Sequence, residues 1–428
     1  MVRLFDLRFD QFMGRYGFLV GAALVLAAGV GLLIVGRSAR TPAALALCVL
    51  GVVGGAFAVQ AVPRFAHAAQ RAAFAPPPRA PTGPYAVVEA NLILPPAGSG
   101  ASPIRALVFA PAAPGQKAPG SCAALSGLRL PDAAGQAAPE TSSRPAWPLL
   151  LFAPGLEGGA REMASIAAEL ASRGFFIVAL DDPLSQTPPP RPTFFDFSSD
   201  EAFAATLRRS EAKAQADARR ALDALDRLRA CAGAAFSRSV DFNRVGFFGF
   251  SFGGGVAATA ASLDPRVVAA ANIDGWVFGE AETRLDKPYL ALFSDEPLPT
   301  REALKSEDPA RRNYARQQRD FVAAQARLFE DEGKFGFQLR NTAHGDFTDA
   351  AFARTGRPDR WVFVDPDEVH GVAADYLAAF FGAYLRGEAG ELLRAAPPPA
   401  RGVIALKGRR GWAEGDEPVP VRSWFGLD

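Results

Sequence analysis

A serine lies in a glycine-rich turn that is typical of nucleophilic catalysis. Residues 249–253, Gly-Phe-Ser-Phe-Gly, fit the G-x-S-x-G pattern, with an apolar strand-like run before them and a helix-like run after them. Side chains at Gly249 and Gly253 would collide in so tight a turn, so glycine is needed at both positions. Ser251 would project from the end of the strand, where the next helix N-terminus favours developing negative charge. The pattern predicts that Ser251 is a nucleophile.

A serine hydroxyl needs a base, and the chain contains three histidines. His67 lies beside a predicted membrane segment and is set aside. His344 lies in a polar stretch, residues 341–348, directly after the last predicted strand, which is where a base is expected in the chain order serine, acid, histidine. His370, at the start of the closing helix, is the alternative. The sequence favours His344.

The acid that would orient the imidazole has two candidates. Asp274 and Asp295 each follow a predicted strand in the interval between Ser251 and His344. The more usual position, after the second of these strands, favours Asp295. The residues alone leave both open.

Two backbone N–H groups are needed to bind the oxyanion of an acyl-transfer reaction. One is expected from Phe252, the residue after the nucleophile, and the other from the loop that follows the apolar run 149–153.

The elements that position these residues alternate between strand-like and helix-like runs. Such alternation predicts a mostly parallel central sheet with helices on both faces, and the serine turn between a strand and a helix indicates the α/β-hydrolase fold in particular. The catalytic domain is expected over residues 85–390, followed by a loosely ordered tail at 391–428. Strands are expected at 87–94, 104–110, 149–153, 175–180, 243–248, 267–273, 289–293 and 335–340, and helices at 162–172, 200–230, 252–263, 311–331 and 372–386.

The N-terminal segment, residues 1–74, contains two uncharged apolar runs, 17–36 and 43–62. Each is long enough as a helix to cross roughly 30 Å of hydrocarbon, which predicts a two-helix transmembrane hairpin. A Pro-rich linker at 75–84 follows it. Three arginines precede the hairpin and three follow it, whereas the turn between the two runs contains only Arg37 and Arg40. Because arginines are enriched on the cytoplasmic side of a membrane, this count slightly favours a cytoplasmic catalytic domain.

Composition limits the classes of function. The 428 residues include 46 basic and 45 acidic side chains, a balance that gives no reason to expect a nucleic-acid partner. The sequence holds no phosphate-binding loop, dinucleotide fingerprint or metal triad, so a mechanism without metal or cofactor is expected. Cys122 and Cys231 either pair or remain free thiols, and the sequence does not decide between them.

Four segments together resemble the platelet-activating factor acetylhydrolase family: Phe-Ala-Pro-Gly-Leu at 152–156, Gly-Phe-Ser-Phe-Gly-Gly at 249–254, Asn-Ile-Asp-Gly-Trp-Val-Phe at 272–278 and Thr-Ala-His-Gly-Asp-Phe-Thr-Asp at 342–349. The resemblance covers residues 85–385. It implies that Asp274 is the acid, that His344 is the base, and that Leu156 donates the second oxyanion N–H. Pro154 stands where the family commonly has histidine, which changes the pocket wall and leaves the donor in place.

The resemblance also implies an activity, the calcium-independent hydrolysis of short or oxidised acyl esters of glycerophospholipids. The predicted hairpin would hold such an enzyme beside lipid, and a bacterial inner membrane is the expected location. A broad carboxylesterase or lipase acting on soluble esters is the first alternative. A membrane-tethered binding protein without turnover is the second.

Other residues have simpler interpretations. The phenylalanines at 194–197 are expected to form an apolar lid or to pack in the core. The charges of 208–229 are interpreted as a solvated helix face, and Asp181 and Asp182 as loop residues.

Overall fold

The computed structural model describes residues 78–98, 101–128, 130–131, 146–186, 193–279, 281, 285–295, 299–353, 365–400 and 402–406. The predicted membrane spans, residues 17–36 and 43–62, lie outside these ranges, so the hairpin stays a prediction. Within the described ranges, no helix has both the length and the apolar character needed to cross a bilayer. The chain divides into two compact units: the larger consists of Arg79–Asp349 and Val369–Asp428, and the smaller includes Ala350–Glu368.

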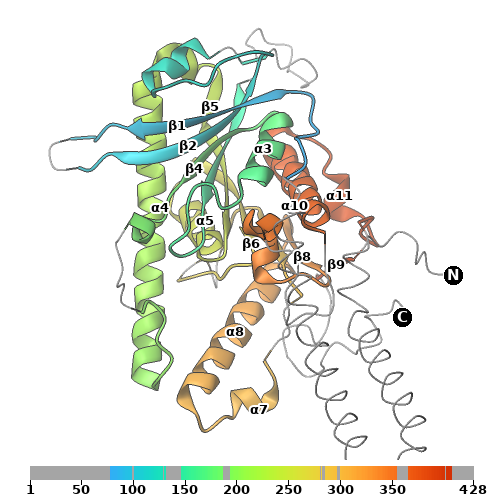
Figure 1. Cartoon of the computed structure of the whole chain (residues 1–428). Helices are drawn as coiled ribbons and strands as arrows, with labels where there is room; N and C mark the ends of the chain where they lie inside the picture. The colour runs from blue at the N-terminus through green and yellow to red at the C-terminus, as the bar shows by residue number, and fades with distance from the viewer. Residues whose placement is uncertain are drawn as a thin grey trace, which may run out of the picture. The chain divides into compact units, whose positions relative to one another are not determined.

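Nine strands of the described residues form one sheet in the larger unit (Figure 1). Their order is β1-β2-β4-β3-β5-β6-β7-β8-β9. The strands from β4 to β8 are parallel, and β1, β2 and β9 pair antiparallel at the edges, which confirms the predicted mostly parallel sheet. The strands are β1 (Ala86–Leu94), β2 (Ile104–Ala112), β3 (Trp147–Ala153), β4 (Phe176–Leu180), β5 (Val240–Phe250), β6 (Val267–Ile273), β7 (Tyr289–Phe293), β8 (Lys334–Leu339) and β9 (Val403–Ala405).

Helices follow the strands along the chain. They are α3 (Ala164–Ser172), α4 (Asp200–Ser237, kinked at Gly233), α5 (Phe252–Leu263), α7 (Arg301–Leu304), α8 (Pro309–Leu328), α9 (Ala350–Ala353), α10 (Pro366–Phe381) and α11 (Glu391–Arg394). Short turns of other helical types are η2 (Ala123–Gly127), η3 (Pro183–Gln186), η4 (His344–Phe347) and η5 (Gly382–Arg386).

The central strands are buried on both faces, as their continuous apolar runs require. On one face, Leu149 and Leu151 of β3 belong to the hydrophobic core that α4 and α5 cover. On the other face, Phe248 of β5 contacts Phe381 of α10. Near that second contact, α3 and α10 are joined by an ion pair between Arg173 and Asp375, 2.7 Å apart. Helices therefore cover both faces, as predicted.

The predicted loosely ordered tail is corrected in part by the structure. Residues 403–405 form β9, which pairs antiparallel with Leu339 and its neighbours at the end of β8. Three residues carry too little pattern to be recognised as a strand, since their partner lies more than 60 positions earlier in the chain. The end of the predicted linker is also in contact with the domain, because the Gly83 N–H donates to the Ser172 hydroxyl of α3 at 3.0 Å.

A disulfide joins Cys122 to Cys231, a pairing that the sequence left open. Cys122 lies in the loop between β2 and β3, and Cys231 lies in α4, 109 positions later. The bond fastens a long irregular loop to the helix that covers one face of the sheet.

Loss of this disulfide is expected to lower the free energy of unfolding by about 4 kcal/mol, because a cross-link across so long a loop restricts the unfolded chain. Urea unfolding of the Cys122→Ser, Cys231→Ser double variant measures the change. Wild type with a reducing agent serves as its matched control and is expected to unfold at the same midpoint. Equal midpoints for the oxidised wild type and the double variant would contradict the expectation.

Candidate active site

Ser251 occupies a strained turn between β5 and α5. Its backbone φ is 53°, in the left-handed region that non-glycine residues seldom adopt outside functional sites. A Cβ atom at Gly249 would lie 2.1 Å from the Gly253 carbonyl oxygen, and one at Gly253 would lie 2.1 Å from the Ala153 oxygen. The predicted need for glycine on both sides of the serine therefore has a direct steric basis.

His344 extends its ring to Ser251. The distance from His344 Nε2 to Ser251 Oγ is 3.0 Å, within hydrogen-bond range. His344 begins η4, the turn after β8, and the carboxylate of Asp346 accepts a hydrogen bond from the Ala343 N–H at the start of that turn. The ring of Phe250 stacks on the imidazole with centroids 4.6 Å apart, which limits its rotation.

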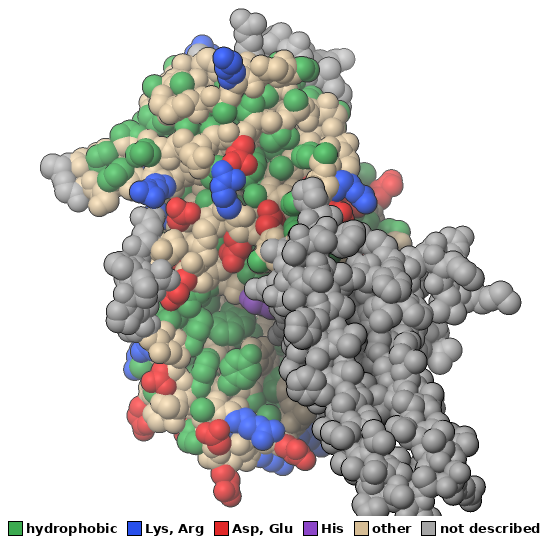
Figure 2. Space-filling view, in the orientation of Figure 1, with side chains coloured by type: hydrophobic (Ala, Val, Ile, Leu, Met, Phe, Trp, Pro, Cys, Tyr) green, Lys and Arg blue, Asp and Glu red, His purple; other side chains and the backbone are tan. Residues whose placement is uncertain are grey.

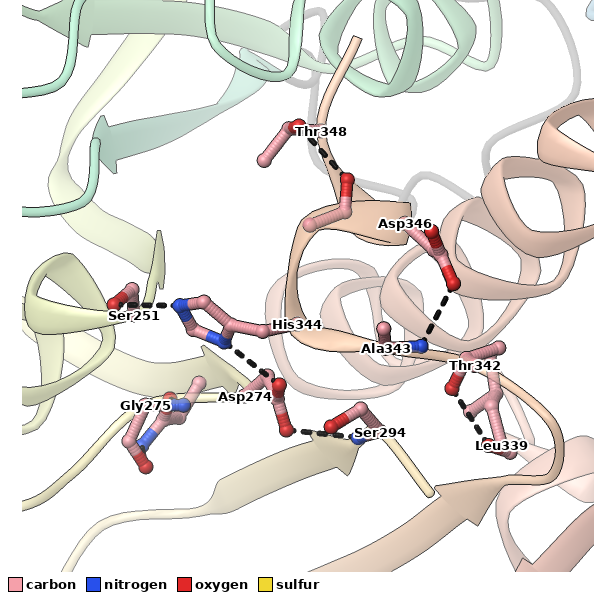
Figure 3. A network of polar contacts seen from close by, with 12 residues as sticks. Ser251, Asp274, Gly275, Ser294, Leu339, Thr342, Ala343, His344, Asp346 and Thr348 are labelled. Carbon is pink, nitrogen blue, oxygen red and sulfur yellow. Dashed lines mark hydrogen bonds and ion pairs between the residues drawn. The ribbon is translucent and has the colours of Figure 1, made fainter. Parts of the chain in front are cut away.

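Asp274 supports the imidazole from the other side (Figure 3). Its Oδ2 lies 2.8 Å from His344 Nδ1, and its Oδ1 accepts a hydrogen bond from the Ser294 N–H at 2.7 Å. A carboxylate only accepts hydrogen bonds, so Nδ1 carries the proton and Nε2 is left to accept the Ser251 hydroxyl. The structure thus brings Ser251, His344 and Asp274 into one hydrogen-bonded chain.

Asp295, the alternative acid, lies just after β7, and its hydrogen bonds are to the segment before His344. Its Oδ2 accepts from the Asn341 N–H at 2.9 Å, and its own N–H donates to the Thr342 carbonyl. Asp295 therefore anchors the chain just before His344, while Asp274 contacts the His344 ring.

The two expected oxyanion donors lie on either side of the serine. Phe252 is the first residue of α5, so its N–H has no partner within the helix. Leu156 lies in the loop after β3, and Gly155 beside it sits against the Ser251 side chain. In the described part of the chain, neither the Leu156 nor the Phe252 N–H donates to a protein acceptor.

His370, the alternative base, belongs to a second polar cluster. The Oγ of Ser165 lies 2.6 Å from His370 Nδ1 and donates to Asp349 at 2.7 Å. His370 Nε2 lies 3.1 Å from the Asp346 carbonyl oxygen, and the side chain is buried. Burial raises the pKa of Asp349, against the hydrogen bonds from Ser165. The cluster ties α3 and α10 to the segment that carries His344.

Charged residues that the sequence assigned to a solvated face or to loops lie close to the oxyanion donors. Lys213 of α4 is nearly buried and forms ion pairs with Asp182 at 2.8 Å and with Asp217 at 2.6 Å. The solvated reading of this part of α4 is therefore wrong at Lys213. The sequence does contain one signal for the Lys213–Asp217 pair, because oppositely charged residues four positions apart on a helix lie close together. The contact between Lys213 and Asp182 depends on tertiary packing and has no such signal.

Glu162 is another carboxylate that the sequence did not single out. Its Oε2 accepts a hydrogen bond from the Gly155 N–H at 2.7 Å. Burial raises the pKa of Glu162, and the Gly155 hydrogen bond and the nearby His344 ring act in the opposite direction.

A series of aromatic contacts begins at Phe252, the first residue of α5, and continues through Phe194 and Phe195 to Phe197. The ring of Phe194 meets that of Phe252 edge-on with centroids 5.8 Å apart, and Phe195 meets Trp276 at 5.2 Å. Phe197 contacts Tyr314, whose side chain is half exposed. We name Phe194, Phe195, Phe197, Trp276 and Tyr314 the aromatic surface. Hydrophobic side chains gather on the face that also exposes a histidine (Figure 2).

Comparison with known proteins identifies a matching family and a large set of similar solved structures. Residues 135–335 match the dienelactone hydrolase family, a range that contains Ser251 and Asp274 and ends before His344. A ferulic acid esterase from Streptomyces cinnamoneus matches with a TM-score of 0.49 and 21% identity, covering 77% of this chain and 98% of that one. No curated protein matches the chain.

The resemblance to the platelet-activating factor acetylhydrolase family, drawn from four segments, stays a prediction, since the family whose model matches is the dienelactone hydrolase family. By its fold and by this match, the chain over residues 135–335 is similar to the dienelactone hydrolase family within the α/β-hydrolase superfamily.

Proposed function

We propose that this protein is a serine ester hydrolase that works through an acyl-enzyme intermediate. The observation that carries the proposal is the continuous chain of hydrogen bonds from Ser251 through His344 to Asp274, at 3.0 and 2.8 Å. A hydroxyl, an imidazole and a carboxylate in this order are the groups that acyl transfer requires. The family match over residues 135–335 supports the same class of chemistry.

The reaction has two halves. His344 Nε2 takes the proton of Ser251 as its Oγ bonds to the ester carbonyl carbon, and the carbonyl oxygen becomes an oxyanion. The N–H groups of Leu156 and Phe252 stabilise that charge, and Asp274 stabilises the imidazolium. His344 then protonates the leaving alcohol as the ester C–O bond breaks. Water, deprotonated by His344, attacks the acyl-enzyme and releases the acid and free Ser251.

For the substrate class, we propose glycerophospholipids with a short or oxidised acyl chain, hydrolysed without calcium. The motifs around Ser251, Asp274 and His344 support this, as does the aromatic surface beside Phe252, which offers apolar contact to a lipid ester. The predicted hairpin at 17–36 and 43–62 would hold the enzyme beside lipid. A broad carboxylesterase is the competing assignment.

Hydrolysis across acyl lengths is expected to separate these assignments. Release of acid is measured from phosphatidylcholine vesicles carrying an sn-2 acetyl or an sn-2 palmitoyl chain, with a chelator present, and from p-nitrophenyl acetate, butyrate and palmitate. The acetyl phospholipid is expected to have a kcat/KM at least about 100-fold above that of the palmitoyl phospholipid, a difference of about 2.7 kcal/mol in transition-state binding.

Ser251→Ala serves as the control for each substrate. Turnover of the p-nitrophenyl esters with no turnover of either phospholipid would reject the lipid assignment and leave a carboxylesterase. Equal rates on both phospholipids would reject selection for short chains.

A further inference from the structure

The loop between β3 and α3 is held by carboxylates on both sides of Leu156. We name residues 154–160 the oxyanion loop. The Gly155 N–H donates to Glu162 at 2.7 Å, and the Glu157 N–H donates to Asp182 at 2.7 Å. The Leu156 N–H lies between these two anchored groups. The loop is therefore fixed on either side of the one N–H that would face the substrate.

Asp182 is well placed to hold this loop still. Its side chain is 4% exposed, and both oxygens are engaged: Oδ2 by the Glu157 N–H, and Oδ1 by the Leu184 N–H and by Lys213 Nζ. Glu157 has a φ of 61°, a strained conformation for a residue with a side chain. Its hydrogen bond to Asp182 opposes relaxation of that strain.

Lys213 connects the same carboxylate to the other half of the predicted oxyanion site. Its Nζ lies 5.4 Å from the centroid of the Phe252 ring, a cation–π distance. The Asp182–Lys213 pair thus joins four elements at the carboxyl end of the sheet: the loops after β3 and β4, helix α4 and the first residue of α5. Since charges this deeply buried interact strongly, the arrangement resists displacement.

We propose that Asp182 and Lys213 are positioning residues that set the distance between the Leu156 and Phe252 N–H groups. The inference rests on the proposed function. Both side chains act through the groups that they hold: both oxygens of Asp182 accept hydrogen bonds, one of them from the Glu157 N–H, and Lys213 is paired with Asp182 and Asp217. An amide at position 182 keeps one acceptor, but its NH₂ group then faces either the Glu157 N–H or the Lys213 ammonium.

The test uses Asp182→Asn and Lys213→Gln in the full chain. Each is expected to lower kcat for p-nitrophenyl acetate by about 10- to 100-fold, the cost of a poorly placed oxyanion donor. KM is expected to stay within about threefold, because the ground-state ester scarcely uses these N–H groups. Affinity for an alkyl trifluoromethyl ketone, which forms a tetrahedral adduct with the serine, is expected to fall by the same factor as kcat.

Asp264→Asn is the matched control. Asp264 pairs with Arg266 at 2.8 Å and follows α5 at the end away from Phe252, so its loss breaks a comparable ion pair outside the site. Its kcat is expected to stay within about twofold of wild type. A double variant of Asp182 and Lys213 is expected to lose no more activity than the worse single variant, because both act through one contact.

Three results overturn the proposal. The first is an active wild type with unchanged kcat in Asp182→Asn and Lys213→Gln. The second is a loss of activity in either variant with unchanged affinity for the trifluoromethyl ketone. The third is full additivity of the two substitutions. If Asp182→Asn does not fold, Lys213→Gln and Lys213→Met decide the question by the same affinity measurement. A wild type that neither hydrolyses esters nor reacts with a fluorophosphonate overturns the proposed function itself. An active wild type with unaffected variants overturns only the positioning role of Asp182 and Lys213.

Discussion

Ser251→Ala is expected to lower kcat on p-nitrophenyl acetate by about 10⁴- to 10⁶-fold, the range seen when the nucleophile of a Ser–His–Asp triad is removed. The hydroxyl hydrogen-bonds to His344 Nε2 at 3.0 Å, and alanine leaves no atom to form the acyl-enzyme. The fold should persist, because the strained backbone at position 251 is set by the glycines around it and by the Ser251 N–H donated to the Ile273 carbonyl.

The chain offers a matched control for this substitution. Ser165 also pairs with a histidine and lies near an aspartate, but the His370 of that cluster is 5% exposed and donates toward a backbone carbonyl. Ser165→Ala is expected to keep its turnover and its labelling by a fluorophosphonate. Labelling of Ser251→Ala, or loss of labelling in folded Ser165→Ala, would move the nucleophile away from Ser251. If the folded wild type is not labelled, the alternative of a membrane-tethered binding protein without turnover is favoured instead.

Asp274→Asn is expected to lower kcat by about 10⁴-fold, because an amide at this position favours the wrong tautomer of His344. Asp274 Oδ2 lies 2.8 Å from Nδ1, and the Ser294 N–H fixes the other oxygen, so the asparagine would keep the same place and lose the charge. The measurement is single-turnover acylation at neutral pH, compared with thermal unfolding of the same variant.

Asp295→Asn separates the two acids. Asp295 accepts from the Asn341 N–H, so its replacement is expected to lower thermal stability and to reduce kcat by less than about tenfold. The reverse pattern, a large kinetic loss at Asp295 with near-normal turnover in Asp274→Asn, would transfer the triad acid to Asp295 and weaken the likeness to the acetylhydrolases.

Much of the fold was predictable because its signals are local. Strand β6 and helix α5 have the predicted bounds. An apolar run of strand length and a Gly- and Ala-rich helical run can each be recognised from about a dozen consecutive residues. The serine turn is local as well: the steric need at Gly249 and Gly253 arises within five positions.

The choice between Asp274 and Asp295 as the triad acid depends on contacts between distant segments and not on local pattern. Both follow strands of suitable position, and only the path of the segment 340–344 decides which carboxylate meets the His344 ring. Lys213 was misread for the same reason, because its helix pattern does not reveal that the loop after β4 folds over it. Contacts between segments distant in sequence carry these parts of the site, and periodicity does not encode them.

The Cys122–Cys231 disulfide has a consequence for the side of the membrane on which the catalytic domain lies. Disulfides persist in oxidising compartments and are rare where thiol reductants are abundant, so we expect the catalytic domain to face away from the cytoplasm. The flanking arginines favour the cytoplasmic side instead, so the two signals indicate opposite sides. A two-span hairpin returns the chain to the side on which it began, so the predicted spans at 17–36 and 43–62 would also place the N-terminus outside. The short turn with Arg37 and Arg40 would then be the part that meets the cytoplasm, and these two arginines are the most closely spaced within residues 1–79.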